Sequence, residues 1–217
     1  MENQPSPRKI SFSLYLTAFF ISAIIFAFGV YVGTLVQNDN LQAISQDISA
    51  ANQKMGSVQL LYLFGDSPDL CPVYLSELYS IDAQTEQLGY KIAFLEDKKD
   101  AYDPELKKSY FLLESSAYLL SQKVREKCEA NYSTVLYFYS NARCQDCRQQ
   151  GNELLAVKKK LGEGIRIYSF DGDLGSPIVD ALKKRYGVSG YPSLVVNSNL
   201  TVKGLKSQGW IEGSLQN

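Results

Sequence analysis

The chain has 217 residues and a formal net charge of −1, with 22 Lys and Arg residues against 23 Asp and Glu residues. This balance excludes the strongly basic class of proteins that bind nucleic acids through their phosphates. Histidine is absent, which excludes His-based acid–base catalysis, His-ligated zinc and His-ligated haem. Chemistry must therefore come from thiols, carboxylates, tyrosines and lysines, and the four cysteines are the most reactive of these groups.

The first predicted element is an apolar helix near the N-terminus. Residues 10–36 contain no charged side chain, and a membrane-spanning helix needs about 20 such residues. Arg8 and Lys9 precede this run and Asp39 follows it, so the positive-inside rule predicts a cytoplasmic tail at 1–9 and an extracytoplasmic remainder. A cleaved signal peptide is the alternative, but its apolar core of about 7–15 residues would be shorter. We expect a single-pass signal anchor in the cell membrane.

Two long helices are predicted after the membrane segment. Residues 37–56 are polar with apolar side chains at helical spacing, and we interpret them as a stalk. Within 57–130, apolar residues recur three or four positions apart on both sides of a short polar connection at 97–103. Asp103 followed by Pro104 is typical of a helix start. A short connection favours an antiparallel helical hairpin.

Cys71 and Cys128 open and close this predicted hairpin. They lie equally far from the connection, so an antiparallel hairpin brings them to the same height on its apolar face. An even number of cysteines outside the cytoplasm favours disulfides, and we predict a structural disulfide between these two. The alternatives are two buried reduced cysteines, which behave as small hydrophobic residues, and a four-cysteine zinc site with two ligands from each part of the chain.

The other two cysteines, Cys144 and Cys147, form a Cys-x-x-Cys motif. The apolar run 134–139 before the motif predicts a buried strand, and the apolar spacing in 149–161 after it predicts a helix. The N-terminus of a helix stabilises a thiolate through its free N–H groups and its dipole. The motif therefore indicates redox chemistry, against the alternatives of a static disulfide or half of a metal site.

The remaining sequence predicts the rest of a small α/β unit. Residues 164–170 alternate as a strand, and 176–187 predict a helix with a proline in its first turn and a glycine at its end. Strands at 194–197 and 200–203 are expected to pair as a hairpin. Pro192 lies directly before the first of them, at a position where a cis X-Pro bond can occur.

A Cys-x-x-Cys between a strand and a helix, followed 45 positions later by a proline before another strand, resembles the thioredoxin superfamily. The resemblance covers 131–217. It implies that Cys144 is the exposed attacking thiol and Cys147 the resolving thiol. It also implies that Tyr191 and Pro192 belong to the substrate-binding surface.

The motif departs from the thioredoxin pattern in three residues. Thioredoxin-like reductases carry Trp before the first cysteine and Gly-Pro between the two, whereas this chain has Arg143 and then Gln145-Asp146. The strand before the motif also lacks the acid that some family members bury there. Arg143 favours a thiolate and Asp146 disfavours it, so the direction of electron flow does not follow from these residues.

The sequence therefore predicts an α/β protein, in which a thioredoxin-like domain at 131–217 is preceded by an antiparallel helical hairpin and a single N-terminal transmembrane helix. The expected function is that of a membrane-anchored thiol–disulfide oxidoreductase acting on protein disulfides outside the cytoplasmic membrane. It needs no cofactor and no metal. Its partners would be protein substrates with thiols or disulfides and a redox partner that recycles the cysteine pair. The alternative is a non-enzymatic thioredoxin-like binding or assembly module with structural disulfides.

Overall fold

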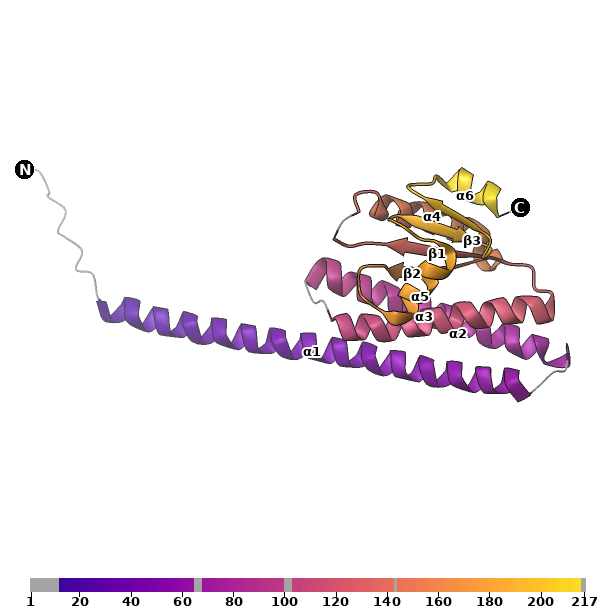
Figure 1. The fold of residues 1–217 in the computed structure, drawn as a ribbon. Coiled ribbons are helices and arrows are strands. Elements are labelled where there is room, and N and C mark those ends of the chain that lie inside the picture. The colour runs from indigo at the N-terminus through magenta and orange to yellow at the C-terminus, as the bar shows by residue number, and fades with distance from the viewer. Residues whose placement is uncertain (1–11, 65–67, 100–102, 143, 216–217) are drawn as a thin grey trace, which may run out of the picture. The chain divides into compact units, whose positions relative to one another are not determined.

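The computed structural model describes residues 12–64, 68–99, 103–142 and 144–215 (Figure 1). The chain divides into two compact units, Met1–Ala43 and Ile44–Asn217, and the helix α1 (Phe12–Phe64) contributes to both. The cytoplasmic tail predicted at 1–9 lies outside the described residues.

The first unit contributes one long apolar helical stretch. Phe12–Thr34 is long and apolar enough to cross a membrane, by a test of length and composition that N-terminal signal sequences also pass. Its large side chains are exposed, as for Phe19, which is 69% exposed. The hydroxyls of Thr17 and Thr34 donate to carbonyls of their own helix. The polar side chains at both ends of the stretch therefore satisfy themselves within the helix, as a lipid environment requires.

The second unit begins with the C-terminal part of α1. From Ile44 on, apolar side chains three or four positions apart are buried: Ile44, Ile48, Ala51, Met55 and Val58. This segment, the second half of the stalk predicted at 37–56, therefore packs as an amphipathic helix inside the folded unit. The polar composition of the segment belongs to the opposite, exposed face.

The helix α2 (Cys71–Lys99) pairs with this part of α1 through side chains along both helices. The Lys91 ammonium nitrogen lies 2.8 Å from a carboxylate oxygen of Asp47, and that of Lys54 lies 3.1 Å from a carboxylate oxygen of Glu77. Because the later residue of α2 meets the earlier residue of α1, the two segments run in opposite directions. These exposed and half-exposed ion pairs fix register more than they add stability.

The helix α3 (Pro104–Cys128) begins as the sequence predicts. The Asp103 side chain caps it by accepting hydrogen bonds from the first free backbone N–H groups. A disulfide joins Cys71, the first residue of α2, to Cys128, the last residue of α3, with a Cα–Cα distance of 5.5 Å. The predicted connection between these helices falls partly on residues 100–102, which lie outside the described residues.

Four strands form one mixed sheet in the order β2-β1-β3-β4. The strands β1 and β2 are parallel, whereas β3 is antiparallel to both β1 and β4. Helices connect and cover these strands in the same unit as α2 and α3, so the structure does not divide at the predicted boundary between 130 and 131. The bounds are β1 (Ser133–Tyr139), α4 (Cys147–Leu161), β2 (Ile165–Asp171), α5 (Pro177–Tyr186), β3 (Ser193–Val196), β4 (Leu200–Lys203) and α6 (Gln208–Ser214), with short 3-10 helices at Pro68–Leu70 and Gly162–Gly164.

Helices cover both faces of the sheet at β1 and β2, with α4 and α6 on one side and α2 and α3 on the other (Figure 1). On the first side Val135 of β1 packs with Val157 of α4 and Ile211 of α6. On the second side the Phe170 ring of β2 lies 5.7 Å from the Phe111 ring of α3, measured between centroids. This double burial explains why 134–139 reads as a continuous apolar run rather than an alternating one.

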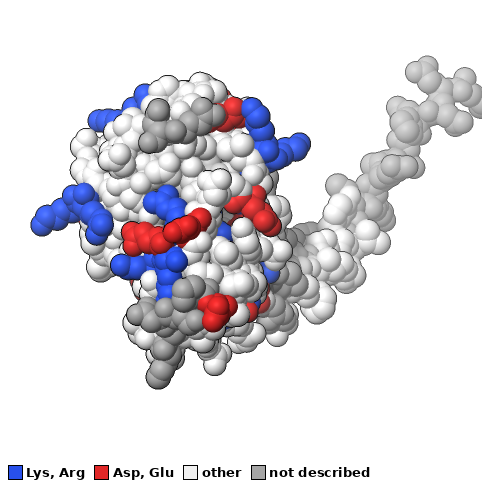
Figure 2. Space-filling view, turned by 90° about the vertical axis from the view of Figure 1, so that its right-hand side faces the viewer, with Lys and Arg blue, Asp and Glu red and all other residues white. Residues whose placement is uncertain are grey.

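The helix α6 has no counterpart in the sequence prediction. It is only seven residues long, so it shows less than two turns of periodicity. Its start is marked by Ser207, whose side chain accepts a hydrogen bond from the Trp210 N–H. On the face of the molecule drawn in Figure 2, basic and acidic side chains lie among one another, in keeping with the balanced net charge.

Replacing both Cys71 and Cys128 by Ala should lower the free energy of unfolding of the folded unit by about 4 kcal/mol, because the bond closes a loop with a sequence separation of 57. Chemical denaturation of wild type and variant under non-reducing conditions measures this difference. The alkylation rate of reduced Cys144 should stay the same in the variant.

The matched control replaces Cys144 and Cys147 by Ser and keeps the first disulfide. This control should lose much less stability than the Cys71/Cys128 variant. Equal losses in the two variants, or a changed alkylation rate of Cys144 without the first disulfide, would contradict a purely structural role for the Cys71–Cys128 bond.

Candidate functional site

The Cys-x-x-Cys motif forms a closed disulfide at the start of α4. The Cα atoms of Cys144 and Cys147 are 5.4 Å apart. Cys147 is the first residue of the helix and is buried, whereas Cys144 precedes the helix and is half-buried. The central strand β1 ends at Tyr139, shortly before the motif. The pair therefore lies where the N-terminal dipole of a helix stabilises a thiolate.

Backbone contacts hold the start of α4 in place. The Tyr137 hydroxyl donates a 2.6 Å hydrogen bond to the carbonyl oxygen of Cys147, and the Gln150 N–H donates to the carbonyl oxygen of Asp146 at 2.9 Å. The Asp146 side chain makes no capping hydrogen bond and is exposed, so water screens its effect on the thiols. Arg143, the basic residue predicted to favour a thiolate, lies outside the described residues.

A buried glutamine ties α4 to the C-terminal segment. The Gln150 side chain accepts from the N–H of Lys206 at 2.7 Å and donates to the carbonyl of the same residue at 3.2 Å. One turn further, Glu153 accepts from the N–H of Gln208 at the start of α6. These contacts fix the helix that carries the cysteines, and the sequence analysis did not single out either side chain.

The Tyr191–Pro192 peptide bond is cis and directly precedes β3. Ser193 pairs with Phe138 near the end of β1, so this loop lies at the same end of the sheet as the Cys144–Cys147 loop. The Pro192 carbonyl accepts a 2.8 Å hydrogen bond from the N–H of Gly204. The two loops that the sequence singles out are thus brought to one edge of the molecule.

The Tyr191 side chain covers the turn that follows β2. A side chain at Gly172 would collide with the Tyr191 ring, so the close approach of the two requires glycine there. The Lys183 ammonium group lies 5.7 Å from the centroid of the same ring, and a hydrogen bond with Tyr191 raises the pKa of Lys183. Tyr191 is therefore held from two sides while remaining partly exposed.

A buried ion network lies at the same end of the sheet. Lys107 is only 1% exposed, and its ammonium group lies 3.0 Å from both Asp171 and Glu96. It also lies 5.5 Å from the centroid of the Tyr139 ring, and Glu96 accepts a 3.4 Å hydrogen bond from Asn141 in the loop before the motif. The network thus joins α2, α3 and the end of β2 to the loop that carries Cys144.

The sequence contains one pattern that marks Lys107 and Glu114 as buried, although neither residue was predicted to be so. Lys107, Phe111, Glu114 and Tyr118 follow one another at helical spacing, and all four are buried. By composition alone, a helix face with two charged residues resembles one that faces solvent. The aromatic residues between them mark the stripe as a second buried face of α3.

Glu114 is buried between α3 and the outer edge of β2. It accepts hydrogen bonds from the Tyr110 hydroxyl and, at 3.1 Å, from the backbone N–H of Ser169. Burial raises the pKa of Glu114 to about 8, although both hydrogen bonds act in the opposite direction. The carboxyl group is therefore mostly protonated at neutral pH.

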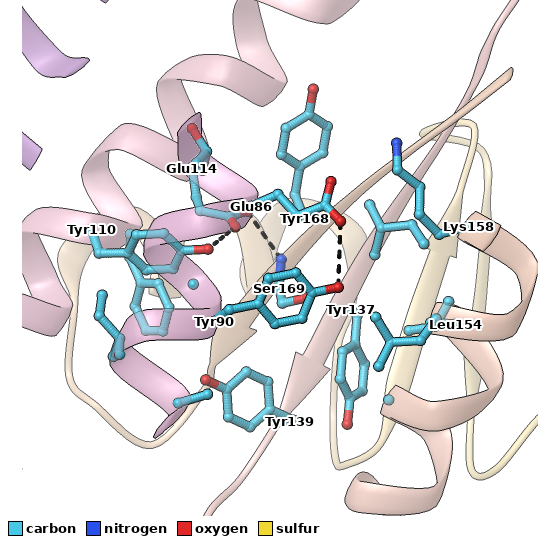
Figure 3. Close-up of a pocket in the computed structure, with 18 of the residues that line it drawn as sticks. Glu86, Tyr90, Tyr110, Glu114, Tyr137, Tyr139, Leu154, Lys158, Tyr168 and Ser169 are labelled. Atoms are coloured by element: carbon cyan, nitrogen blue, oxygen red, sulfur yellow. Dashed lines mark hydrogen bonds between the residues drawn. The ribbon is translucent and has the colours of Figure 1, made fainter. Parts of the chain in front are cut away.

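A cavity of about 270 Å³ lies between α2, α3, α4 and the strands β1 and β2 (Figure 3). Neither Cys144 nor Cys147 belongs to its lining. The redox pair and the cavity are neighbours through Tyr137, which lines the cavity and also binds the carbonyl of Cys147. The aromatic residues of the lining are Tyr90, Tyr110, Phe111, Tyr137, Tyr139 and Tyr168.

The four cysteines form two separate disulfides, Cys71–Cys128 and Cys144–Cys147. This arrangement differs from the four-cysteine zinc alternative, which requires all four thiolates at one point. Within the described ranges, no group of three or more Cys, Asp or Glu side chains could hold a metal ion.

No protein-family model and no curated protein matches the chain. Among solved structures, it is similar to one titled "Structure of a malarial protein", with 22% identity over 40% of this chain and 96% of that chain, at a TM-score of 0.35. It is also similar to a chloroplastic thioredoxin z, with 16% identity over 44% and 86% of the two chains. Thioredoxin-2 of a malaria parasite shares 23% identity over 40% and 84% of the chains, and both comparisons have a TM-score of 0.35.

Two features that the sequence analysis singled out are present in the structure. They are a Cys-x-x-Cys at the start of the helix after β1 and a cis-proline before β3. The α2 and α3 helices and the C-terminal part of α1 pack with this arrangement in the same unit.

The stability of the folded unit should decrease as pH rises from about 5 to about 8, because of Glu114. Its pKa is about 8 in the folded protein and near the ordinary 4.5 in the unfolded chain. The folded state therefore retains a proton that the unfolded state releases in this window, and the stabilisation is complete only below it. Denaturant titrations at several pH values should show a slope of up to about 1.4 kcal/mol per pH unit.

The Glu114→Gln variant tests this assignment, since its amide keeps the size of the side chain but does not titrate. The slope between pH 5 and 8 should flatten in this variant and persist in Glu163→Gln, an exposed control. An unchanged slope in Glu114→Gln would show that another group titrates.

Proposed function

We propose that the protein is a thiol–disulfide oxidoreductase whose redox pair is Cys144 and Cys147. The observation that carries this proposal is the disulfide between a half-buried and a buried cysteine at the N-terminus of α4. A substrate thiolate can reach the half-buried sulfur, while the buried one is protected from other partners. The helix dipole stabilises the thiolate that each step of exchange requires.

In the oxidising direction a substrate thiolate attacks the sulfur of Cys144. The Cys144–Cys147 bond breaks, a substrate–Cys144 bond forms, and Cys147 leaves as a thiolate. A second substrate thiolate then attacks the substrate sulfur of this mixed disulfide, which yields the substrate disulfide and reduced Cys144. The reducing direction is the same sequence in reverse, with Cys147 resolving the mixed disulfide.

The substrate chain is proposed to lie against the loop at Tyr191 and Pro192. This loop lies at the same end of the sheet as the motif. A hydrogen bond from the N–H of Gly204, which follows β4, to the carbonyl of Pro192 holds the loop in place. Pro192 is buried, whereas Tyr191 is half-exposed, and its backbone would pair with an extended peptide in the manner of an added strand. The substrates would be proteins with thiols or disulfides, and a separate redox partner would recycle the pair.

The location proposed for this chemistry is the outer side of the cell membrane. The apolar stretch Phe12–Thr34 supports a single-pass anchor, and Arg8 and Lys9 before it support a cytoplasmic N-terminus. The two disulfides in the second unit are consistent with an oxidising compartment. The helices α2 and α3 would act as a hairpin that extends the folded unit beside the redox site.

Replacing Cys147 by Ser should trap substrate proteins on Cys144, because the resolving thiolate is missing. Non-reducing gel electrophoresis of the tagged variant, isolated after acid quenching, should show adducts that disappear on reduction. The Cys144→Ser variant is the matched control and should show none, since Cys147 is buried. Adducts in neither variant would instead support a binding module with a static Cys144–Cys147 bond.

A membrane-impermeant maleimide tests the proposed orientation in intact cells. In a chain without Cys71 and Cys128, mild reduction should make Cys144 reactive from outside. A Ser6→Cys variant should be labelled only after the membrane is permeabilised. Labelling of Ser6→Cys in intact cells would indicate the inverted orientation, and loss of the Ser6→Cys segment from the mature protein would indicate a cleaved signal peptide.

A further inference from the structure

The cavity between α2, α3 and α4 contains the outer edge of strand β2. This strand is at the end of the sheet, with β1 on one side only. The N–H of Ser169 donates outward to Glu114, and the carbonyl of Ile165 accepts outward from Lys158 at 3.0 Å. Backbone groups point the same way at every second residue of a strand, so the N–H and C=O of Ile167 also point outward.

The backbone N–H and C=O of Ile167 are therefore a free donor and acceptor among the described residues. They lie between Ile165 and Ser169, whose outward groups already have side-chain partners. Ile167 and Ser169 line the cavity, and Figure 3 shows Ser169 bonded to Glu114 with Tyr rings around it. Among the hydrogen bonds of the described residues, none outside the sheet engages Ile167. A free strand edge binds groups that carry both an N–H and a C=O, as an amide does.

The lining of the cavity carries charges of both signs. Lys107 is paired with Glu96 and Asp171, and Arg166 is paired with Asp82. Two further nitrogens of Arg166 are buried without a hydrogen-bond partner among the described residues, and Lys158 and Glu86 also line the cavity. Net charge therefore does not select the ligand, whereas the buried polar groups favour one that can donate and accept hydrogen bonds.

The aromatic side chains that line the cavity favour a ligand with a flat ring. Tyr90 of α2 and Leu155 of α4 are exposed at the mouth, whereas Tyr137, Tyr168 and Leu154 are buried deeper in the lining. Aromatic walls favour aromatic ligands through offset and edge contacts. Because drug-sized pockets hold roughly 300–1,000 Å³, a cavity of about 270 Å³ fits one or two rings.

Gly151, a glycine inside helix α4, is a separate observation on the shape of the cavity. It lies inside α4, where glycine costs about 1 kcal/mol of helix stability relative to alanine, and it lines the cavity. Its φ angle is not in the left-handed region, and a Cβ atom there would meet no atom within 4 Å. Neither backbone conformation nor packing requires glycine at this position, whereas any side chain would narrow the cavity.

We propose that this cavity is a binding site for a small aromatic molecule that carries an amide, with the amide paired to the outward N–H and C=O of Ile167. The site is separate from the proposed redox chemistry, because neither cysteine of the motif lines it. Binding would also bridge α4 to α2 and α3 across the edge of the sheet.

The test is a titration of the full chain in phosphatidylcholine nanodiscs with 2-naphthamide, followed by the fluorescence of the naphthyl group. Saturable binding to wild type is expected. The matched probe naphthalene should bind about tenfold more weakly, because it lacks the amide. Absence of saturable 2-naphthamide binding, or equal binding of naphthalene, would overturn the proposal.

The variant Gly151→Leu fills the cavity and should weaken 2-naphthamide binding about tenfold or more. The control Gly56→Leu makes the same change inside another helix, where a Cβ also meets no atom within 4 Å, and it should bind like wild type. Circular dichroism checks that both variants fold. If Gly151→Leu does not fold, Gly151→Ala should still weaken binding, because its methyl group occupies part of the cavity. Unchanged affinity in the folded Gly151 variant would refute the site.

Discussion

The outer edge of β2 is the constraint on which the rest of the folded unit depends. An edge strand carries backbone groups that need partners, yet here helices cover it on its outer side. Side chains from those helices therefore supply the partners, with Glu114 of α3 at Ser169 and Lys158 of α4 at Ile165. This requirement explains why charged residues occur in helix faces that are otherwise apolar. It also explains why the helices and the sheet form one unit instead of two domains.

The buried Lys107 network imposes a second constraint. Burying an ammonium group costs several kcal/mol unless it is fully paired, and Lys107 is paired with one carboxylate from α2 and one from the end of β2. Such a network adds little net stability, but it tolerates only one arrangement of the three elements. Because Asn141 of the loop before Cys144 also binds Glu96, the position of the redox loop depends on the register between α2 and α3.

The sequence predicts those parts of the structure that depend on local patterns. The cap at Asp103, the helix start at Cys147 and the proline before β3 are each encoded within a few residues. The Cys71–Cys128 pairing follows from simple distances along two helices. Lys107 and Glu114 could not be predicted in the same way, because their partners lie on β2 more than 50 positions away. The packing of the C-terminal half of α1 could not be predicted from composition, because composition hides which face of a helix is buried.

The two disulfides differ in how much the fold depends on them. In the chain-entropy description, the stabilisation by a disulfide grows with the logarithm of the loop that it closes. The Cys71–Cys128 bond has a sequence separation of 57 and the Cys144–Cys147 bond one of 3, which corresponds to about 4 and about 2 kcal/mol. Helix α4 is also held by Tyr137 and Gln150, whose contacts do not involve sulfur. The small loop can therefore open and close while the surrounding structure stays intact, which is the property that a redox-active pair needs and that the bond between α2 and α3 does not have.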